Sequence, residues 1–306
     1  MVGAMSDTAA PSPEPALENP TRALLRERDF LLFWAARFVS TLGVQIQSVA
    51  LGWQVYAIAR LTRSVGESAF LVSMIGLAQF LPLFLLTLVA GETADRRTRK
   101  LIVAATLALD AISAGVLLVL ALMGSHQLWP IFAISVLFGA SRAFLSPASS
   151  AMGPMLVPRP LLPRAIAWNS LSWQAGSIGG PALGGLLLIH SPALAFGASF
   201  GLYLTAALLA LAIRKPTKPE PQPGSRMELI QEGLAYVWNN KIVFGSISLD
   251  LFAVILGGAT ALLPVFAKDV LHIGPGGFGL LRAAPAIGAC LVGIYLAANP
   301  IRRHAG

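Results

Sequence analysis

The 306-residue chain is 56% hydrophobic and only 12% charged, with a net charge of +8. A soluble domain of this size could not bury so many apolar side chains, and the mean hydropathy of +0.72 indicates lipid as the solvent. Most of the 22 Lys and Arg lie in alternate connections between apolar stretches. This bias is typical of the cytoplasmic loops of membrane proteins, so we expect no nucleic-acid partner.

Apolar stretches of the length that a membrane-spanning helix needs, roughly 20 residues, follow one another along the chain. In lipid every backbone polar group needs an internal partner, and the stretches lack the alternation of a barrel strand, so we expect helices. The predicted fold class is an all-α membrane protein. The stretches are about 30–57, 67–90, 101–122, 129–151, 166–189, 192–212, 242–267 and 276–297.

The predicted domains follow from these stretches. Residues 1–28 are rich in Pro and lack the apolar core of a signal peptide, so we expect a disordered cytoplasmic tail. A six-helix transmembrane bundle is predicted over 29–213, a cytoplasmic linker over 214–240, two further helices over 241–298 and a cytoplasmic end over 299–306. Within the linker, residues 227–238 have the spacing of a short amphipathic helix.

The distribution of basic residues predicts the orientation. Only Arg60, Arg63 and Lys268 lie in the connections that would face outward, whereas the tail, the inner connections and the linker carry most of the others. We therefore expect a multi-pass protein of a bacterial inner membrane with both termini in the cytoplasm.

Two stretches on opposite sides of the linker resemble each other. The sequence GLAQFLP at 76–82 and the sequence GLLRAAP at 279–285 share Gly, Leu and Pro at matching positions. Both lie in helices that would run from outside to inside. This similarity indicates an internal parallel repeat, of which the chain would hold one complete copy and the first two helices of the next.

The segment GETADRRTRK at 91–100 places a dense charge cluster between two apolar stretches. We expect Gly91 to permit a tight reversal and Asp95 to cap the next helix. Basic side chains here would bind lipid headgroups, Asp95 or another helix end. A simple positive-inside anchor is the alternative. The spacing of Gly91, Asp95, Arg96, Arg99 and Lys100 resembles the loop signature of the major facilitator superfamily, although Thr93 and Thr98 depart from it.

A second motif, GSIGGPALGG, lies in the stretch 166–189. Glycines four residues apart share one helix face, so a neighbouring backbone can approach closely, and a proline within the helix bends it. A purely structural helix contact would explain the same pattern. The motif resembles the signature of antiporters and exporters within the superfamily at Gly176, Gly180, Pro181, Gly184 and Gly185.

Polar side chains inside a membrane are costly and are candidates for function. One such stripe runs along the first helix and contains Arg37, Thr41, Gln45, Ser48 and Gly52. The first helix lines the central cavity in the superfamily, so the resemblance implies that this stripe faces the substrate.

Five positions elsewhere complete the candidates for the cavity or for proton coupling. Asp110 and Asp250 are the deepest acids, and each could exchange a proton or neutralise Arg142 and Arg37, respectively. Arg142 is similar to an arginine of proton-driven drug exporters, although the residues after it differ. Asn169 and Trp173 share a helix face and could form part of a cavity wall.

The sequence contains neither a phosphate-binding loop nor a nucleophile motif, and its histidines lack metal-ligand spacing, so we expect neither an enzyme, a metal site nor a cofactor. Resemblance over about residues 22–300 identifies the chain as a member of the major facilitator superfamily, similar to the branch of enterobactin and macrolide exporters. It implies a secondary active exporter of a small amphipathic molecule, driven by a proton gradient through alternating access.

Superfamily members usually have twelve helices, so we expect that a continued reading frame or a partner supplies four more. Two alternatives remain open. One is a facilitator or importer of a small metabolite with the same fold, and the other is a truncated membrane protein without transport.

Overall fold

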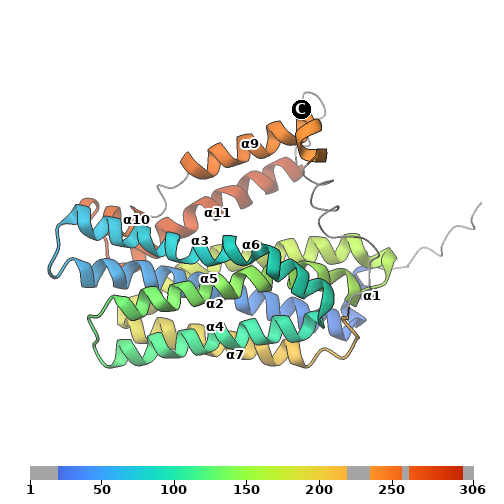
Figure 1. The fold of residues 1–306 in the computed structure, drawn as a ribbon, viewed down its shortest axis with the longest axis horizontal. Helices are drawn as coiled ribbons and strands as arrows, with labels where there is room; N and C mark the ends of the chain where they lie inside the picture. The colour runs from blue at the N-terminus through green and yellow to red at the C-terminus, as the bar shows by residue number, and fades with distance from the viewer. Residues whose placement is uncertain (1–19, 219–234, 257–261, 299–306) are drawn as a thin grey trace, which may run out of the picture.

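The computed structural model describes residues 20–218, 235–256 and 262–298. Its first part is a bundle of long helices joined by short connections (Figure 1). The predicted stretches match these helices within a few residues, except where noted below. The helices are α1 (Pro20–Arg26), α2 (Arg28–Ala59), α3 (Val65–Arg96), α4 (Arg99–Leu122), α5 (Trp129–Met152), α6 (Leu162–His190) and α7 (Pro192–Leu211).

Local sequence sets where several helices begin and end. Ser64 and Glu67 form a capping box at the start of α3, in which each side chain accepts a hydrogen bond from the other residue's backbone amide. Ser191 caps α7 in the same manner by accepting from the Leu194 amide at 3.2 Å. After α4 the chain reverses at Gly124, whose φ of 62° suits glycine best.

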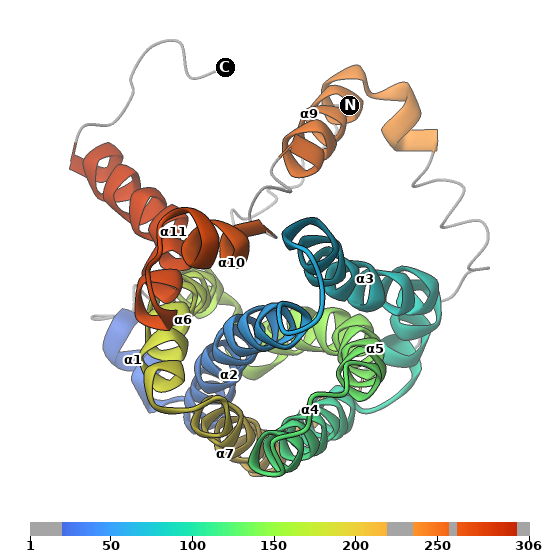
Figure 2. The same cartoon turned by 90° about the vertical axis from the view of Figure 1, so that its left-hand side faces the viewer.

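Viewed along the bundle, α2, α3, α5, α4 and α7 follow one another around a ring (Figure 2). Helix α6 packs on the outside of α2, and its other side packs against α11 (Pro275–Ala298). Helix α9 (Lys241–Leu256) lies apart from the ring in both views. The described residues therefore form a six-helix unit, α2 to α7, with α9 and α11 as two further long helices.

The predicted helix 242–267 consists of separate pieces in the described residues. Helix α9 ends at Leu256, and residues 257–261 lie outside the described part. A short helix α10 (Leu263–Val265) follows, and a π-helical turn η4 (Phe266–Val270) extends beyond the predicted end. Pro264 lies in the first turn of α10, where its missing amide hydrogen costs no hydrogen bond.

By length and composition, six of the described helices could cross a bilayer, namely α2, α3, α4, α5, α7 and α11. Helix α6 is long enough, with 29 residues, but is not among them. The glycines of the motif GSIGGPALGG and the polar stretch near Trp168 lower the mean hydropathy of α6.

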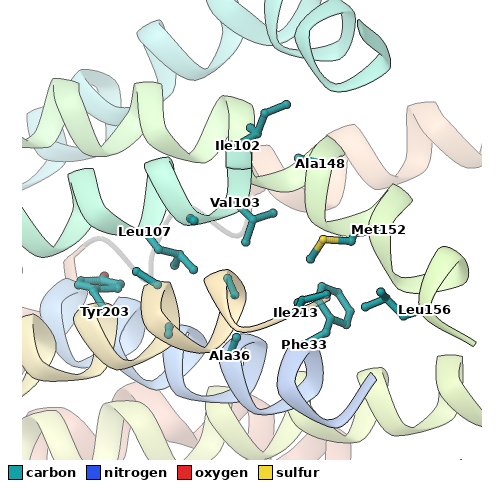
Figure 3. Packing of buried hydrophobic residues seen from close by; sticks show 14 of the residues in the cluster. Phe33, Ala36, Ile102, Val103, Leu107, Ala148, Met152, Leu156, Tyr203 and Ile213 are labelled. Carbon is teal, nitrogen blue, oxygen red and sulfur yellow. The ribbon is translucent and has the colours of Figure 1, made fainter. Parts of the chain in front are cut away.

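The interior of the bundle contains two apolar clusters. Figure 3 shows one of them, where Phe33, Met152 and Ile213 pack together near one end and Leu107 and Tyr203 lie further along. Because lipid is as apolar as these side chains, close packing rather than water exclusion holds the helices together.

The predicted disordered tail 1–28 is wrong from residue 20 onward. Residues 20–26 form α1, and its Leu24 is fully buried in the cluster of Figure 3. Residues 1–19 lie outside the described part of the chain. Three apolar residues, Ala23, Leu24 and Leu25, were too weak a sequence signal for this short helix.

The first residues of the predicted linker are fixed to the bundle. Asp29 accepts hydrogen bonds from the backbone amides of Arg214 and Lys215 at 3.2 and 2.8 Å. The Lys215 Nζ donates to Glu27 Oε2 at 2.6 Å and to the Leu156 carbonyl at 2.8 Å. The predicted amphipathic helix 227–238 lies outside the described residues except for 235–238, which are helical.

Candidate functional site between the two groups of helices

The glycine face of α6 packs directly against α2. A Cβ atom placed on Gly176 would lie 2.6 Å from the Thr41 Cγ2, and one on Gly180 would lie 2.5 Å from the Gln45 Cβ. Such separations leave no room for a side chain, so only glycine permits this approach. All five motif residues are buried, namely Gly176, Gly180, Pro181, Gly184 and Gly185.

A second face of α6 meets α11 through a pair of glycines. A Cβ on Gly185 would lie 2.9 Å from the Gly279 Cα, and one on Gly279 would lie 2.5 Å from the Pro181 carbonyl oxygen. We call this contact, made by Gly185 and Gly279, the glycine seam. It joins the six-helix bundle to the C-terminal helices with backbone against backbone.

A cavity of about 190 Å³ with a mixed polar and apolar lining lies between α2, α3, α10 and α11. Its polar lining consists of Ser48, Gln79 and Arg282. The Arg282 guanidinium donates a hydrogen bond to Ser48 Oγ at 2.6 Å. Gly76 and Gly52 open space on the α3 and α2 walls.

The predicted polar stripe of α2 divides between several environments. Thr41 and Gln45 pack against the α6 glycines and do not line this cavity. Thr41 Oγ1 donates to its own helix at the Arg37 carbonyl, at 2.8 Å. Only Ser48 and Gly52 reach the cavity. Helical spacing correctly placed these residues on adjoining faces but could not identify the neighbour of each.

The two predicted charge pairs are not formed as ion pairs in the described residues. Asp110 is fully buried, and neither carboxylate oxygen has a hydrogen-bond partner there. Arg142 is exposed, and its guanidinium carbon lies 5.9 Å from the centre of the Phe138 ring. Arg37 donates to Ser149 Oγ at 3.5 Å, whereas Asp250 is exposed on α9.

Asn169 and Trp173 do not line the cavity described above. Asn169 is half-buried, and its Oδ1 is buried without a hydrogen-bond partner, whereas 49% of Trp173 is exposed. The neighbouring Trp168 has a structural contact, because its carbonyl accepts a hydrogen bond from Trp34 Nε1 at 2.8 Å.

The predicted reversal at Gly91 is wrong. Helix α3 continues through Gly91 to Arg96, and the turn comes at residues 97–98. Asp95 therefore lies inside α3 rather than capping α4, whose N-cap is Thr98. The Asp95 carboxylate lies 3.9 Å from the Arg99 guanidinium and is mostly exposed. Charged side chains at the end of a helix can reach water without ending the helix, which explains its extra length.

Two basic residues of this segment bind helix ends. Arg99 donates to the Ala151 carbonyl at 3.0 Å, in the last turn of α5, and to Met155 Sδ. Lys100 Nζ donates to the Ile213 carbonyl at 2.9 Å, just after α7. Positive charge at the C-terminal end of a helix satisfies free carbonyls and favours the helix dipole. Arg96 instead pairs with Glu92 on the helix surface at 3.0 Å.

A second contact between the two groups of helices lies at the opposite end of the bundle. The Tyr56 hydroxyl of α2 donates to Asp269 in η4. The Arg60 Nε lies 3.7 Å from the same carboxylate, and Lys268 Nζ lies 5.9 Å from the Tyr56 ring centre. We call Tyr56, Arg60 and Asp269 the end clasp. The sequence did not predict this contact. Its only sequence signal is that Arg60 and Asp269 are among the few charged residues in these connections.

Comparison with known proteins identifies the family. A family model described as transmembrane secretion effector, of the major facilitator type, matches residues 20–304. The chain belongs to this family. It is therefore related to membrane transporters and not to enzymes, as the sequence predicted.

Curated proteins that are similar to this chain include efflux proteins. It is 26% identical over 276 residues to macrolide efflux protein A of Streptococcus pyogenes, covering 87% of this chain and 65% of that protein. It is 29% identical over 265 residues to enterobactin exporter EntS of Shigella dysenteriae serotype 1, covering 86% and 61%. The chain thus spans less than two thirds of the length of these relatives.

Solved transporters share its fold. A bacterial homologue of the lysosomal transporter Spinster has a TM-score of 0.61 at 16% identity, covering 93% of this chain and 64% of that one. A D-xylose–proton symporter has a TM-score of 0.56 at 10% identity, covering 92% and 70%. The predicted major facilitator fold is confirmed.

Proposed function

We propose that the protein acts in secondary active export, moving a small amphipathic molecule out of the cell by alternating access. The glycine seam is the observation that carries this proposal. At Gly185 and Gly279 the two backbones meet without side chains between them, and we infer that this point allows α11 to tilt against α6. The names of the related efflux proteins support export over uptake.

The cavity and the end clasp fit this mechanism. The cavity lies between the six-helix bundle and the C-terminal helices, where superfamily transporters of repeat construction bind substrate. The clasp of Tyr56, Arg60 and Asp269 joins the same two groups at one end. Because that end carries few basic residues, it would face outward, with both termini in the cytoplasm of a bacterial inner membrane. The clasp would thus close the cavity from outside.

Asp110 is our candidate for proton coupling. It is fully buried in the bundle, and its carboxylate oxygens have no hydrogen-bond partner among the described residues. An intramembrane carboxyl of this kind is costly when charged and is typical of proton relays. Arg142 and Asp250 remain further candidates, since both are charged and lie in helices.

The charged segment 91–100 is our candidate for a conformational switch. Arg99 and Lys100 hold it to the ends of α5 and α7, while the exposed Asp95 projects from α3. Helices not contained in this chain, supplied by a continued reading frame or by a partner, would complete the second half of the transporter.

Efflux from energised cells tests the proposed function. The protein, expressed from its gene in an efflux-deficient bacterium, should lower the accumulation of at least one compound in a panel of fluorescent amphipathic molecules. A protonophore should abolish the effect, and so should Gly185→Val, whereas Gly201→Val should not, because a Cβ there meets no atom within 4 Å. Asp110→Asn should remove the response to the proton gradient. Increased accumulation would indicate uptake and contradict export.

A further inference from the structure

We propose that the cavity formed by Ser48, Gln79 and Arg282 binds the anionic group of its ligand, with Arg282 as the charge-recognising residue. The inference rests on the proposed function, because it names the substrate class: amphipathic molecules that carry a carboxylate or another acidic group. Arg282 is the arginine of the sequence GLLRAAP at 279–285.

Arg282 has no counter-charge in the described part of the chain. Its only side-chain hydrogen bond there goes to the neutral Ser48, and it makes no ion pair with a carboxylate of the described residues. Residues 257–261, which precede α10, have the sequence GGATA and so contribute no acid. Asp269 is already held in the end clasp, and Asp250 is exposed on α9.

A guanidinium in this position is costly without an anion. An arginine is charged under all physiological conditions, and placing it inside a membrane without a partner is energetically costly. It also retains several unused donors in a fork that matches two oxygens of one carboxylate. An anionic ligand in the cavity would supply both the missing charge and the missing acceptors.

The internal repeat places the two deciding residues opposite each other. Gln79 of GLAQFLP and Arg282 of GLLRAAP occupy matching positions of the repeated stretch, and both line the same cavity. The amide of Gln79 can donate to an oxygen but carries no charge. The cavity therefore has one charged wall, on α11, and one neutral polar wall, on α3. It can distinguish an acid from its neutral amide.

Equilibrium binding tests this inference without any transport. The probes are radiolabelled 2-naphthoate and its neutral analogue 2-naphthamide, which have nearly the same shape, measured on the protein in nanodiscs of zwitterionic lipid against empty nanodiscs. The protein should bind 2-naphthoate at least tenfold more tightly than 2-naphthamide. Arg282→Gln should abolish this preference, and Arg282→Lys should retain part of it, because the charge remains while the fork is lost.

Arg37→Gln is the matched control. It removes another half-buried arginine of a membrane-spanning helix, and that arginine lies outside the cavity. It should leave the preference for 2-naphthoate unchanged. The inference is overturned if the protein binds both probes equally, or if Arg282→Gln keeps the preference. A further outcome would also overturn the inference. If Arg282→Gln binds neither probe and the stably folded Arg282→Lys shows no preference for 2-naphthoate, Arg282 has a purely structural role.

The two proposals fail in different ways. Anion preference that depends on Arg282 without any efflux in cells would contradict the proposed function and leave the binding site intact. Proton-driven efflux that is unchanged by Arg282→Gln, for acidic and neutral compounds alike, would contradict this site and leave the transporter intact.

Discussion

Individual glycines determine how close α6 can come to its neighbours. Gly176 and Gly180 admit Thr41 and Gln45 of α2, whereas Gly185 meets Gly279 of α11. The motif pattern predicted a close helix contact on this face of α6, but not that α2 would fill it. Spacing along one helix defines a face, and only the fold decides which element packs on it.

Replacing Gly180 by Ala should destabilise the protein. Alanine gains up to about 1 kcal/mol in helix propensity, but the new Cβ would lie 2.5 Å from the Gln45 Cβ. Overpacking of this kind costs about 1–3 kcal/mol, so the net effect should be a lower apparent melting temperature in detergent. Gly179→Ala is the control, because its Cβ would make an ordinary contact of 3.7 Å with Leu42. Equal melting temperatures for the two variants would disprove close packing at Gly180.

Replacing Arg99 by Gln should also lower stability. The part-buried Ala151 carbonyl would lose its charged donor at 3.0 Å, and a hydrogen bond to a charged group contributes about 1.5–3 kcal/mol. Arg97→Gln makes the same change of charge at an exposed position and should have little effect. If thermal unfolding finds the two variants equally stable, Arg99 does not support the end of α5.

At the scale of elements, the sequence predicted most helices and few of their contacts. The bilayer fixes the length of apolar stretches, which is why the predicted bounds agree with α2 through α7 and with α11. Helix α3 ran past Gly91 because a glycine within a helix needs no unusual backbone angle. The clasp between Tyr56 and Asp269 joins residues 213 positions apart, and no local pattern reports such a pair.

The end clasp should behave as one energetic unit between α2 and η4. In a double-mutant cycle with Tyr56→Phe and Asp269→Asn, we expect a coupling energy of about 0.5–3 kcal/mol in thermal unfolding, because Tyr56→Phe removes the hydrogen bond and Asp269→Asn removes the charge that strengthens it. A parallel cycle with Arg63→Gln and Asp269→Asn should show no coupling, since Arg63 is exposed. Additive effects in the first cycle would show that the clasp contributes no stability.

At the scale of the whole molecule, the alternation of helices fixes which connections share a side of the membrane. The α3–α4 turn and the residues after α7 lie at one end of the bundle, where Lys100 joins them. The connections 60–64 and 123–128 lie at the other end. Basic residues predicted this arrangement because loops rich in Lys and Arg stay in the cytoplasm.

Cysteine labelling in intact cells should confirm the topology. In a Cys290→Ser background, single cysteines at Arg96 and Lys218 should react only after the membrane is opened to the reagent. Cysteines at Leu61 and His126 should react from outside, and all four positions are exposed in the structure. Labelling of positions 96 and 218 from opposite sides would refute the helix bundle as described.

The unequal walls of the cavity have a consequence for how a guest would travel. With the cation on α11 and the neutral amide on α3, the acidic head of a bound molecule would stay with the C-terminal helices whenever they tilt, while its apolar body would slide along the six-helix bundle. The bound molecule would then move together with the C-terminal helices. Its release would depend on which other anion or acceptor next binds Arg282.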